Sequence, residues 1–301
     1  MNDTKNSSLH DSGTVTSSPT SPQTDPKPHT ASCTAPKPAG SRWALVLGAS
    51  SGFGEATCRA LAQDGCNIAG VHLDHRAGQE HVESLCADIE QLGRKALFFN
   101  TNAADEKKRD AVLDQVAREW GDGGNDHFQV LFHSLAFGAL LPFVDGSAEV
   151  TISVRQLEMT SLVMAHSLVF WTQALVRRGM MGAGGRIFAM TSSGATSVWR
   201  GYGAVGAAKA ALQAYVRQLA VELAPRHITV NALCAGVTET PALAKVPDHE
   251  QMIQVALRKN PHDRLTRPQD VAEAVVALAS PKTYWITGNV IQVDGGEAVV
   301  G

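Results

Sequence analysis

Short apolar runs alternate with longer segments of helical periodicity from Arg42 to the end of the chain. Bounded by turn residues, the apolar runs predict strands over 43–47, 67–73, 96–99, 128–132, 185–190, 228–233 and 290–293. Apolar residues at helical spacing predict helices over 53–64, 77–92, 107–120, 150–178, 202–224 and 270–279. Strands separated by helices form βαβ crossovers, which place a parallel sheet between two helical layers. We therefore predict an α/β fold, a single doubly wound domain with a seven-stranded parallel sheet.

The composition changes near Ser41. Residues 1–41 hold six of the thirteen prolines, many Ser and Thr, and no aromatic residue. Such a segment cannot bury enough apolar surface to offset the entropy of ordering. We predict a disordered Ser/Thr/Pro-rich tail over 1–41 and a folded domain over 42–301.

The regular alternation also breaks between Pro241 and Pro268. Four prolines bracket one amphipathic piece, Glu250 to Arg258. In a doubly wound fold, ligands bind beyond the carboxyl ends of the strands, and this insert follows the sixth strand at that end. We interpret 241–268 as a substrate lid, with an ordinary surface excursion as the alternative.

Charge and cysteine usage exclude several classes of function. The chain has 26 Lys and Arg against 29 Asp and Glu, a net charge of −3, and no basic run. This balance argues against binding to nucleic acid or to an anionic membrane. The five cysteines are scattered without a CxxC spacing, so we expect neither a disulfide framework nor a metal site. No apolar stretch reaches the roughly 18 to 20 uninterrupted residues that a membrane helix needs, and the N-terminus lacks the apolar core of a secretory signal. We therefore expect a cytoplasmic location.

A glycine-rich turn, GASSGFG, follows the first predicted strand and leads into a helix. Small residues there let backbone N–H groups and the helix N-terminus approach a pyrophosphate, whose charge the helix dipole favours. Asp74 stands at the end of the second strand, twenty residues after Gly54, where a carboxylate binds the adenosine ribose of a dinucleotide. These positions predict a dinucleotide site that includes Gly48, Ser50, Ser51, Gly52, Phe53, Gly54 and Asp74.

Asp74 also bears on the choice of dinucleotide. A carboxylate accepts bonds from the ribose hydroxyls and repels a 2′-phosphate, which favours NADH. His75 and Arg76 follow at once, and a cation nearby would accommodate NADPH. The sequence favours NADH and leaves NADPH possible; a role for Asp74 as a strand-end cap is the alternative.

Several motifs together resemble the short-chain dehydrogenase/reductase family over essentially all of 42–301. Beside the glycine-rich turn they are TSSG from Thr191, a Tyr and a Lys on the following helix, ITVNALCAG from Ile228, and VDGG from Val293. The resemblance implies a Rossmann-type core, a nicotinamide cofactor and a homotetramer.

Two departures from the common family pattern narrow the resemblance. After the fourth strand the chain has HSLAFG from His133, where ordinary members have NNAG. Counting back four residues from Lys209 gives Val205, and the usable tyrosine is Tyr202, seven residues before the lysine. Both features are similar to bacterial enoyl-acyl-carrier-protein reductases.

The spacing of seven also has a direct physical interpretation. On a helix, seven residues make almost two full turns, so Tyr202 and Lys209 share a face about 10 Å apart, whereas a spacing of four gives about 6 Å. A 2-enoyl thioester accepts hydride at C3 while negative charge develops on the oxygen at C1. A phenol moved one turn outward suits that longer substrate.

The resemblance assigns roles to three catalytic candidates. Tyr202 would hydrogen-bond the thioester oxygen as an enolate forms. Lys209 would bind the nicotinamide ribose, and its charge would make the phenol more acidic. Ser192 occupies the place of the catalytic serine of ordinary dehydrogenases and would orient the same oxygen, although serine is equally typical of a turn. For Tyr202 simple packing is the alternative, and for Lys209 a solvated position.

Further positions follow from the resemblance. Relatives hold the adenine at the place of Asn102 and Ala103, although Asn102 is also a common turn residue, and the nicotinamide carboxamide at the place of Gly236 and Thr238. Additional cofactor contacts are expected from Ser134, Leu135 and Ala136. The family's proton-relay Asn is missing, since Thr160 and Ser161 lie at its place. We interpret His133 as a structural imidazole rather than an acid–base catalyst.

The predicted function is NAD(P)H-dependent reduction of the C2–C3 double bond of a 2-enoyl thioester, carried on acyl carrier protein or coenzyme A. A ketoreductase or alcohol dehydrogenase with a displaced tyrosine is the second possibility. A dinucleotide-binding protein without catalysis is the third.

Overall fold

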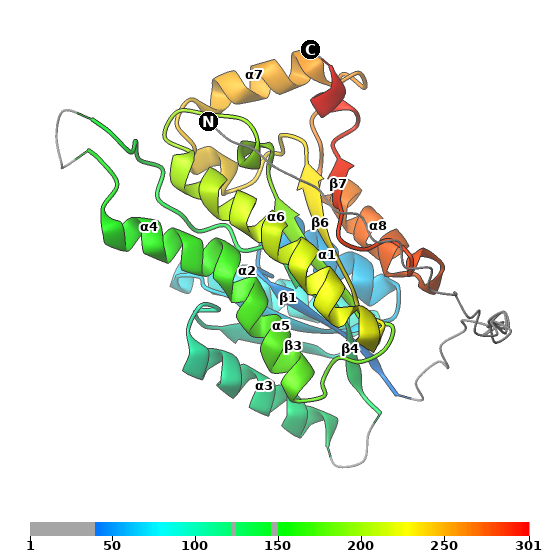
Figure 1. Ribbon diagram of the computed structural model, residues 1–301. Helices are drawn as coiled ribbons and strands as arrows, with labels where there is room; N and C mark the ends of the chain where they lie inside the picture. Colours follow the sequence, from blue (N-terminus) through cyan, green and yellow to red (C-terminus); the bar gives the residue numbers. More distant parts are fainter. Residues whose placement is uncertain (1–39, 122–124, 146–149, 301) are drawn as a thin grey trace, which may run out of the picture. The chain divides into compact units, whose positions relative to one another are not determined.

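The structure is a computed structural model that describes residues 40–121, 125–145 and 150–300. Within these residues one parallel sheet has the strand order β3-β2-β1-β4-β5-β6-β7 (Figure 1). The strands are β1 Arg42–Leu47, β2 Asn67–His72, β3 Ala96–Asn100, β4 His127–His133, β5 Arg186–Thr191, β6 Thr229–Ala235 and β7 Val290–Val293. The predicted doubly wound, seven-stranded sheet is confirmed. The strand order reverses between β1 and β4, which is where such folds bind ligands.

Eight α-helices connect the strands in the part of the chain that the structure describes. They are α1 Gly52–Gln63, α2 Gln79–Gln91, α3 Glu106–Trp120, α4 Val154–Ser161, α5 Ser167–Arg177, α6 Gly203–Leu223, α7 His249–Lys259 and α8 Pro268–Ala279. Short 3₁₀ turns are η1 Arg76–Gly78, η3 Ser193–Ala195, η4 Ala224–Arg226, η5 Leu243–Lys245, η6 Pro281–Thr283 and η7 Glu297–Val299. The predicted lid thus contains η5 and α7.

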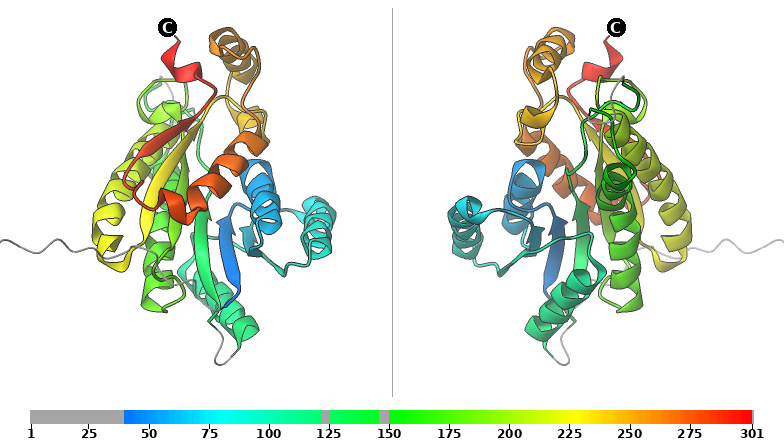
Figure 2. Two further views of the ribbon diagram at one scale, coloured as in Figure 1. Left: turned by 90° about the vertical axis from the view of Figure 1, so that its right-hand side faces the viewer. Right: turned by 90° about the vertical axis from the view of Figure 1, so that its left-hand side faces the viewer.

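Two apolar layers hold the sheet between the helices. Trp43, Leu45 and Leu47 of β1 face a core shared with α3, α5 and α6, while Ala44 and Val46 face a core shared with α1, α2 and α8. Figure 2 shows these two groups of helices on opposite sides of the sheet. Because successive strand residues point to opposite faces, a strand buried on both sides is a continuous apolar run. This is why the strands could be recognised from the sequence.

The predicted helix over 150–178 is one helix from Val154 to Arg177 that contains a π-helical turn, η2, at Leu162–His166. The Oγ of Ser167 donates to the carbonyl oxygen of Val163 at 2.7 Å. By length and composition this helix could cross a membrane, but 56 % of its most apolar window is buried. Packing in the core beside α3 and α6 accounts for its apolar character.

The other predicted boundaries differ by a few residues from those observed. Strand β2 ends at His72, and the next residue, Leu73, is exposed. The predicted tail falls almost wholly on residues 1–39, which lie outside the described residues, so its disorder stays a prediction.

Candidate functional site

The glycine-rich turn after β1 has a backbone that only glycine fits. Gly48 has φ +86, and a Cβ there would lie 2.5 Å from the carbonyl oxygen of Ser134. A Cβ on Gly54 would lie 1.8 Å from the carbonyl oxygen of Gly48. The side chain of Ser51, which precedes α1, makes no capping hydrogen bond to the first N–H groups of the helix. A helix N-terminus without a side-chain cap, preceded by a turn of small residues, fits a pyrophosphate.

The loop after β6 lies against this turn. Gly52 has φ +54, and a Cβ there would lie 3.3 Å from the methyl carbon of Thr240. Within the loop, the Oγ1 of the buried Thr238 donates to the carbonyl oxygen of Gly236 at 2.9 Å. Ser50 and Phe53 are half-buried. The predicted phosphate-binding and nicotinamide-binding segments are therefore neighbours in space.

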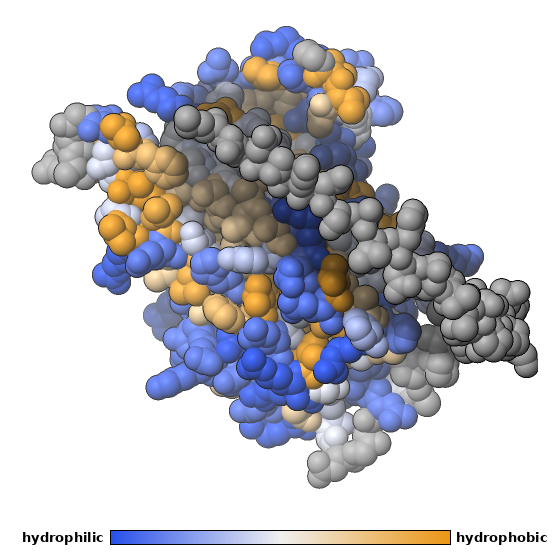
Figure 3. Space-filling view, in the orientation of Figure 1, coloured by the Kyte–Doolittle hydropathy of each residue, from blue (hydrophilic) through white to orange (hydrophobic). Residues whose placement is uncertain are grey.

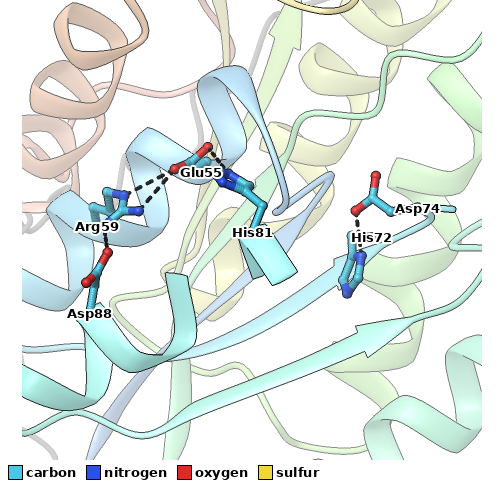
Figure 4. A network of polar contacts seen from close by, with 6 residues as sticks. All are labelled: Glu55, Arg59, His72, Asp74, His81 and Asp88. Atoms are coloured by element: carbon cyan, nitrogen blue, oxygen red, sulfur yellow. Dashed lines mark hydrogen bonds and ion pairs between the residues drawn. The ribbon is translucent and has the colours of Figure 1, made fainter. Parts of the chain in front are cut away.

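Asp74, the predicted ribose-binding residue, is fixed by two neighbours that the sequence analysis did not identify. Its Oδ2 lies 2.8 Å from the Nδ1 of His72, which is buried (Figure 4). The side chain of Asn100, at the end of β3, accepts from the N–H of Asp74 and donates to its carbonyl oxygen. The carboxylate is held at the carboxyl edge of the sheet with one oxygen bonded to His72 and the other without a hydrogen bond in the described residues.

A second polar network ties α1 to α2 near the same edge. Glu55 on α1 bonds Arg59 and His81, and Arg59 also pairs with Asp88 on α2 (Figure 4). Partly exposed ion pairs contribute little to stability individually. The network matters because it fixes α2, and with it the turn that follows Asp74, against the helix that begins at the phosphate-binding turn.

The predicted adenine contacts, Asn102 and Ala103, lie in the turn after β3. The Oδ1 of Asn102 accepts from the N–H of Ala104 at 2.9 Å, which is the geometry of an ordinary Asx turn. The carbonyl oxygen of Ala103 accepts from the indole Nε1–H of Trp171 at 2.8 Å. The turn is thus anchored to α5, and the side chain of Asn102 is engaged in shaping it.

Tyr202 lies at the beginning of α6, where its carbonyl oxygen accepts from the N–H of Gly206 at 2.8 Å. Its hydroxyl donates to the Oγ of Ser192 at 3.4 Å. A Cβ on Gly194 would lie 2.5 Å from the tyrosine ring, so a glycine is needed where the ring packs on the loop after β5. The structure brings the phenol and the predicted serine together.

Val205 stands where the common spacing of four would place a tyrosine. Its side chain is buried in the core on the α6 side of the sheet. A Cβ on Gly138 would lie 2.8 Å from its Cγ2, so the loop after β4 packs against it. No hydroxyl is available at that position.

Lys209 is buried, and its Nζ donates to the carbonyl oxygen of Met190 at 2.7 Å. Burial lowers the pKa of this amine to about 8. Burial raises the pKa of Tyr202, and the hydrogen bond to Ser192 opposes that shift. An acidifying effect of Lys209 on the phenol stays a prediction.

His133 is fully buried at the end of β4. Its Nε2 lies 2.7 Å from the Oγ of Ser167, which itself donates to Val163. Burial, and secondly the charge of Lys209, lower the pKa of His133 to about 3, so the imidazole is neutral. Because the single proton of Ser167 is donated to Val163, the Nε2 carries the proton of this bond, and Nδ1 has no hydrogen-bond partner in the described residues. These contacts favour a structural imidazole.

The loop after β4 carries the other predicted contacts. The N–H of Ser134 donates to the carbonyl oxygen of Leu47 at 2.8 Å; Leu135 is half-buried and Ala136 exposed. Thr160, at the place of the missing relay Asn, accepts from the N–H of Ala139 through its Oγ1 at 3.0 Å. Thr160 therefore fixes this loop against α4.

Several of the exposed side chains are large and apolar. They are exposed in the loops after β4 and β5 and at the beginning of α4, and include Phe137, Phe143, Val144, Val150, Val154 and Val198. A Cβ on Gly203 would lie 2.7 Å from the ring of Phe143, so this ring packs on the first residue of α6, the residue that follows Tyr202. Figure 3 shows hydrophobic surface over the N-terminal part of α4. Residues 40–121, 125–145 and 150–300 contain no cluster of His, Cys, Asp or Glu suited to a metal.

The chain is similar to known proteins over most of its length. A family model described as enoyl-(acyl carrier protein) reductase matches residues 48–297. The chain is 32 % identical to a cis-4-hydroxycyclohexanecarboxylate dehydrogenase of Sinomonas cyclohexanicum, over 86 % of this chain and 97 % of that protein.

Two solved structures are similar over 87 % of the chain. One is a short chain dehydrogenase from Burkholderia cenocepacia in complex with NADP, with a TM-score of 0.72, 28 % identity and all of that chain covered. The other is an enoyl-(acyl-carrier-protein) reductase from Anaplasma phagocytophilum in complex with NAD, with a TM-score of 0.71, 25 % identity and 93 % of that chain covered.

Proposed function

The chain belongs to the short-chain dehydrogenase/reductase family, and from that premise we propose that it reduces the C2–C3 double bond of 2-enoyl thioesters. It is an oxidoreductase, and a nicotinamide dinucleotide is its cofactor. The proposal goes further by naming the bond that is reduced and the residues that take part.

The observation that carries the proposal is the position of the phenol. Tyr202 begins α6 seven residues before Lys209, and the nearer position is filled by the buried Val205. A ketone develops negative charge on the oxygen of the carbon that receives hydride, so its proton donor must lie close to the nicotinamide. An enoyl thioester develops that charge two carbon atoms further away, where an outlying hydroxyl can reach it.

When bound, the cofactor supplies a hydride to C3 of the substrate. Tyr202 would turn its single hydroxyl proton from the Oγ of Ser192 toward the thioester oxygen as the enolate develops. Ser192, 3.4 Å from the tyrosine hydroxyl, would then orient it by donating its own proton to the tyrosine oxygen. Lys209 would bind the ribose hydroxyls, and in its protonated form it would add a positive charge that favours the developing enolate. Protonation at C2 by solvent completes the saturated thioester.

The exposed apolar side chains of the loops after β4 and β5, with the ring of Phe143 packed on Gly203, support an aliphatic acyl chain as the part of the substrate that lies in the site. Its carrier would be acyl carrier protein or coenzyme A. We further propose NADH as the preferred cofactor, because the carboxylate of Asp74 at the adenosine edge would repel a 2′-phosphate. A homotetramer in the cytoplasm is part of the same proposal.

A ketoreductase is the second candidate. The contact of Ser192 with the tyrosine hydroxyl favours it, because a serine and a tyrosine that converge can bind the oxygen of a ketone directly. The 32 % identical relative, named as a dehydrogenase of a hydroxylated acid, supports the same reaction class.

Oxidation of NADH and NADPH, followed by absorbance with crotonyl and with acetoacetyl thioesters, tests the proposal. Faster turnover of the crotonyl thioester is expected. Turnover of the acetoacetyl thioester alone would assign the protein as a ketoreductase. Tight cofactor binding without turnover of either substrate would leave a dinucleotide-binding protein.

A further inference from the structure

Glu297 lies in the turn that follows β7, near the C-terminal end of the chain. The carboxylate of Asp294 fixes this turn, because its Oδ1 accepts from the N–H of Gly296 at 3.0 Å and its Oδ2 from the N–H of Ala298 at 2.9 Å. The carbonyl oxygen of Asp294 in turn accepts from the side chain of the buried Asn260 at 3.0 Å. The backbone that carries Glu297 is therefore held on both sides.

The side chain of Glu297 reaches the loop after β6. Both of its carboxylate oxygens accept from the N–H of Val237, Oε2 at 3.1 Å and Oε1 at 3.3 Å. A Cβ on Gly236 would lie 2.7 Å from Oε2 of Glu297 and 2.5 Å from Oγ1 of Thr266, so the loop backbone lies directly against the carboxylate. A hydrogen bond from a backbone N–H to a carboxylate is stronger than one between neutral groups.

Two charged groups act on this carboxylate, Asp294 of the same turn and Lys259 of α7. Burial raises the pKa of Glu297; the bond to Val237 and the charge of Lys259 lower it, and the charge of Asp294 raises it. Lys259 is the last residue of α7, in the predicted lid. The turn that carries Glu297, η7, contacts the lid helix α7, while the carboxylate of Glu297 binds the loop after β6.

Val237 lies between Gly236 and Thr238, the two residues expected to hold the nicotinamide carboxamide. Further along the same loop, Thr240 contacts the phosphate-binding turn at Gly52. A loop that is already ordered costs the ligand less conformational entropy on binding. We propose that Glu297 is a positioning residue, whose carboxylate holds the backbone of 236–238 in the form that receives the nicotinamide half of the cofactor. This inference rests on the proposed cofactor site, but not on the identity of the substrate.

Two variants and a matched control test the proposal. Glu297→Ala removes the acceptor, Glu297→Gln keeps one acceptor oxygen, and Val299→Ala removes an exposed side chain from the same 3₁₀ turn. In the cofactor-free full-length protein, hydrogen exchange of peptides covering 236–238 is expected to accelerate in Glu297→Ala. It should change less in Glu297→Gln and not at all in Val299→Ala.

The dissociation constants of NADH and of ADP-ribose distinguish a positioning role of Glu297 from a general effect on the stability of the fold. ADP-ribose lacks only the nicotinamide, so Glu297→Ala should weaken NADH about tenfold and leave ADP-ribose unchanged. Equal losses for both ligands, unchanged exchange at 236–238, or no binding of NADH by the wild type would overturn the proposal. If the NADH loss is selective but crotonyl thioesters are not reduced, only the proposed substrate is wrong.

Discussion

The two ends of the proposed cofactor site, an adenosine edge at Asp74 and a catalytic end at Tyr202 and Lys209, differ in how their charged groups are held. At the adenosine edge, Asp74 is partly exposed and its partners come from the ends of β2 and β3. At the catalytic end, Lys209 and His133 are buried, and burial shifts the pKa of each. An exposed carboxylate discriminates between ligands at small cost to the fold, because water screens it. Buried groups act strongly on a reaction but must be compensated by the surrounding protein.

The largest effect should come from breaking the catalytic end at Tyr202. Tyr202→Phe removes the hydroxyl that donates to the developing enolate, and we expect turnover to fall by about 10²–10³-fold. The dissociation constant for NADH should change little, since the adenosine edge and the phosphate-binding turn are untouched. Steady-state kinetics with a crotonyl thioester and a fluorescence titration with NADH measure the two quantities.

Tyr215→Phe is the matched control for that substitution. The hydroxyl of Tyr215 lies 3.0 Å from Nδ1 of His166 on the long helix, away from Ser192 and Lys209. Its loss should leave turnover nearly unchanged. Full activity of Tyr202→Phe would remove the tyrosine from the mechanism.

An effect of intermediate size is expected on the pH dependence of stability, from the buried imidazole of His133. The unfolded chain binds a proton on His133 below pH 6.5, whereas the folded protein, with a pKa of about 3, does not. The free energy of unfolding therefore falls as pH decreases from 6.5 toward 3, by up to about 1.4 kcal/mol per pH unit from this group. Urea unfolding between pH 7 and pH 4.5 should show a shallower decline in His133→Asn than in the wild type.

His127→Asn, at the other end of β4, provides the comparison for the buried site. His127 is only half-buried and lies on the same strand, so the same stability curves are recorded for its replacement as a control for loss of a histidine. Parallel stability curves for His133→Asn and the wild type would mean that burial of this imidazole does not control acid sensitivity.

The smallest effect is expected at the adenosine edge. Asp74→Asn removes the negative charge that would repel a 2′-phosphate, and affinity for NADPH relative to NADH should rise about tenfold. Asp88→Asn removes an equal charge from α2, where Asp88 pairs with Arg59, and should leave the ratio unchanged. Calorimetric titration with NADH and NADPH measures this ratio of affinities. An unchanged ratio in Asp74→Asn would show that another group selects the cofactor.

Much of the catalytic end could be predicted because its signals are local. Gly48 and Gly54 were identified from their spacing in one turn, and Tyr202 and Lys209 from a family resemblance carried by residues of one helix. The bond between His72 and Asp74 had a usable signal that was overlooked. Residues two apart on a strand share a face, so a histidine two positions before a carboxylate can contact it.

Other parts of the site have no local signal. Trp171 supports the carbonyl oxygen of Ala103 across 68 positions, and Glu297 holds the N–H of Val237 across 60. The π-helical turn between α4 and α5 could not be predicted either, because the apolar periodicity of that segment predicts one regular helix. The two long-range contacts of Trp171 and Glu297 depend on which strands are neighbours in the sheet, and that is known only from the tertiary structure.

The sequence by itself determined the alternation of elements, the phosphate-binding turn, and the separation of the phenol from the lysine, because each depends on neighbours within a few residues. Only the tertiary structure decided the protonation properties of Lys209, His133 and Tyr202 and the anchoring of the loop at Val237. The reason is physical: removal from water and long-range hydrogen bonds exist only once the strands have paired and the helices have packed on them.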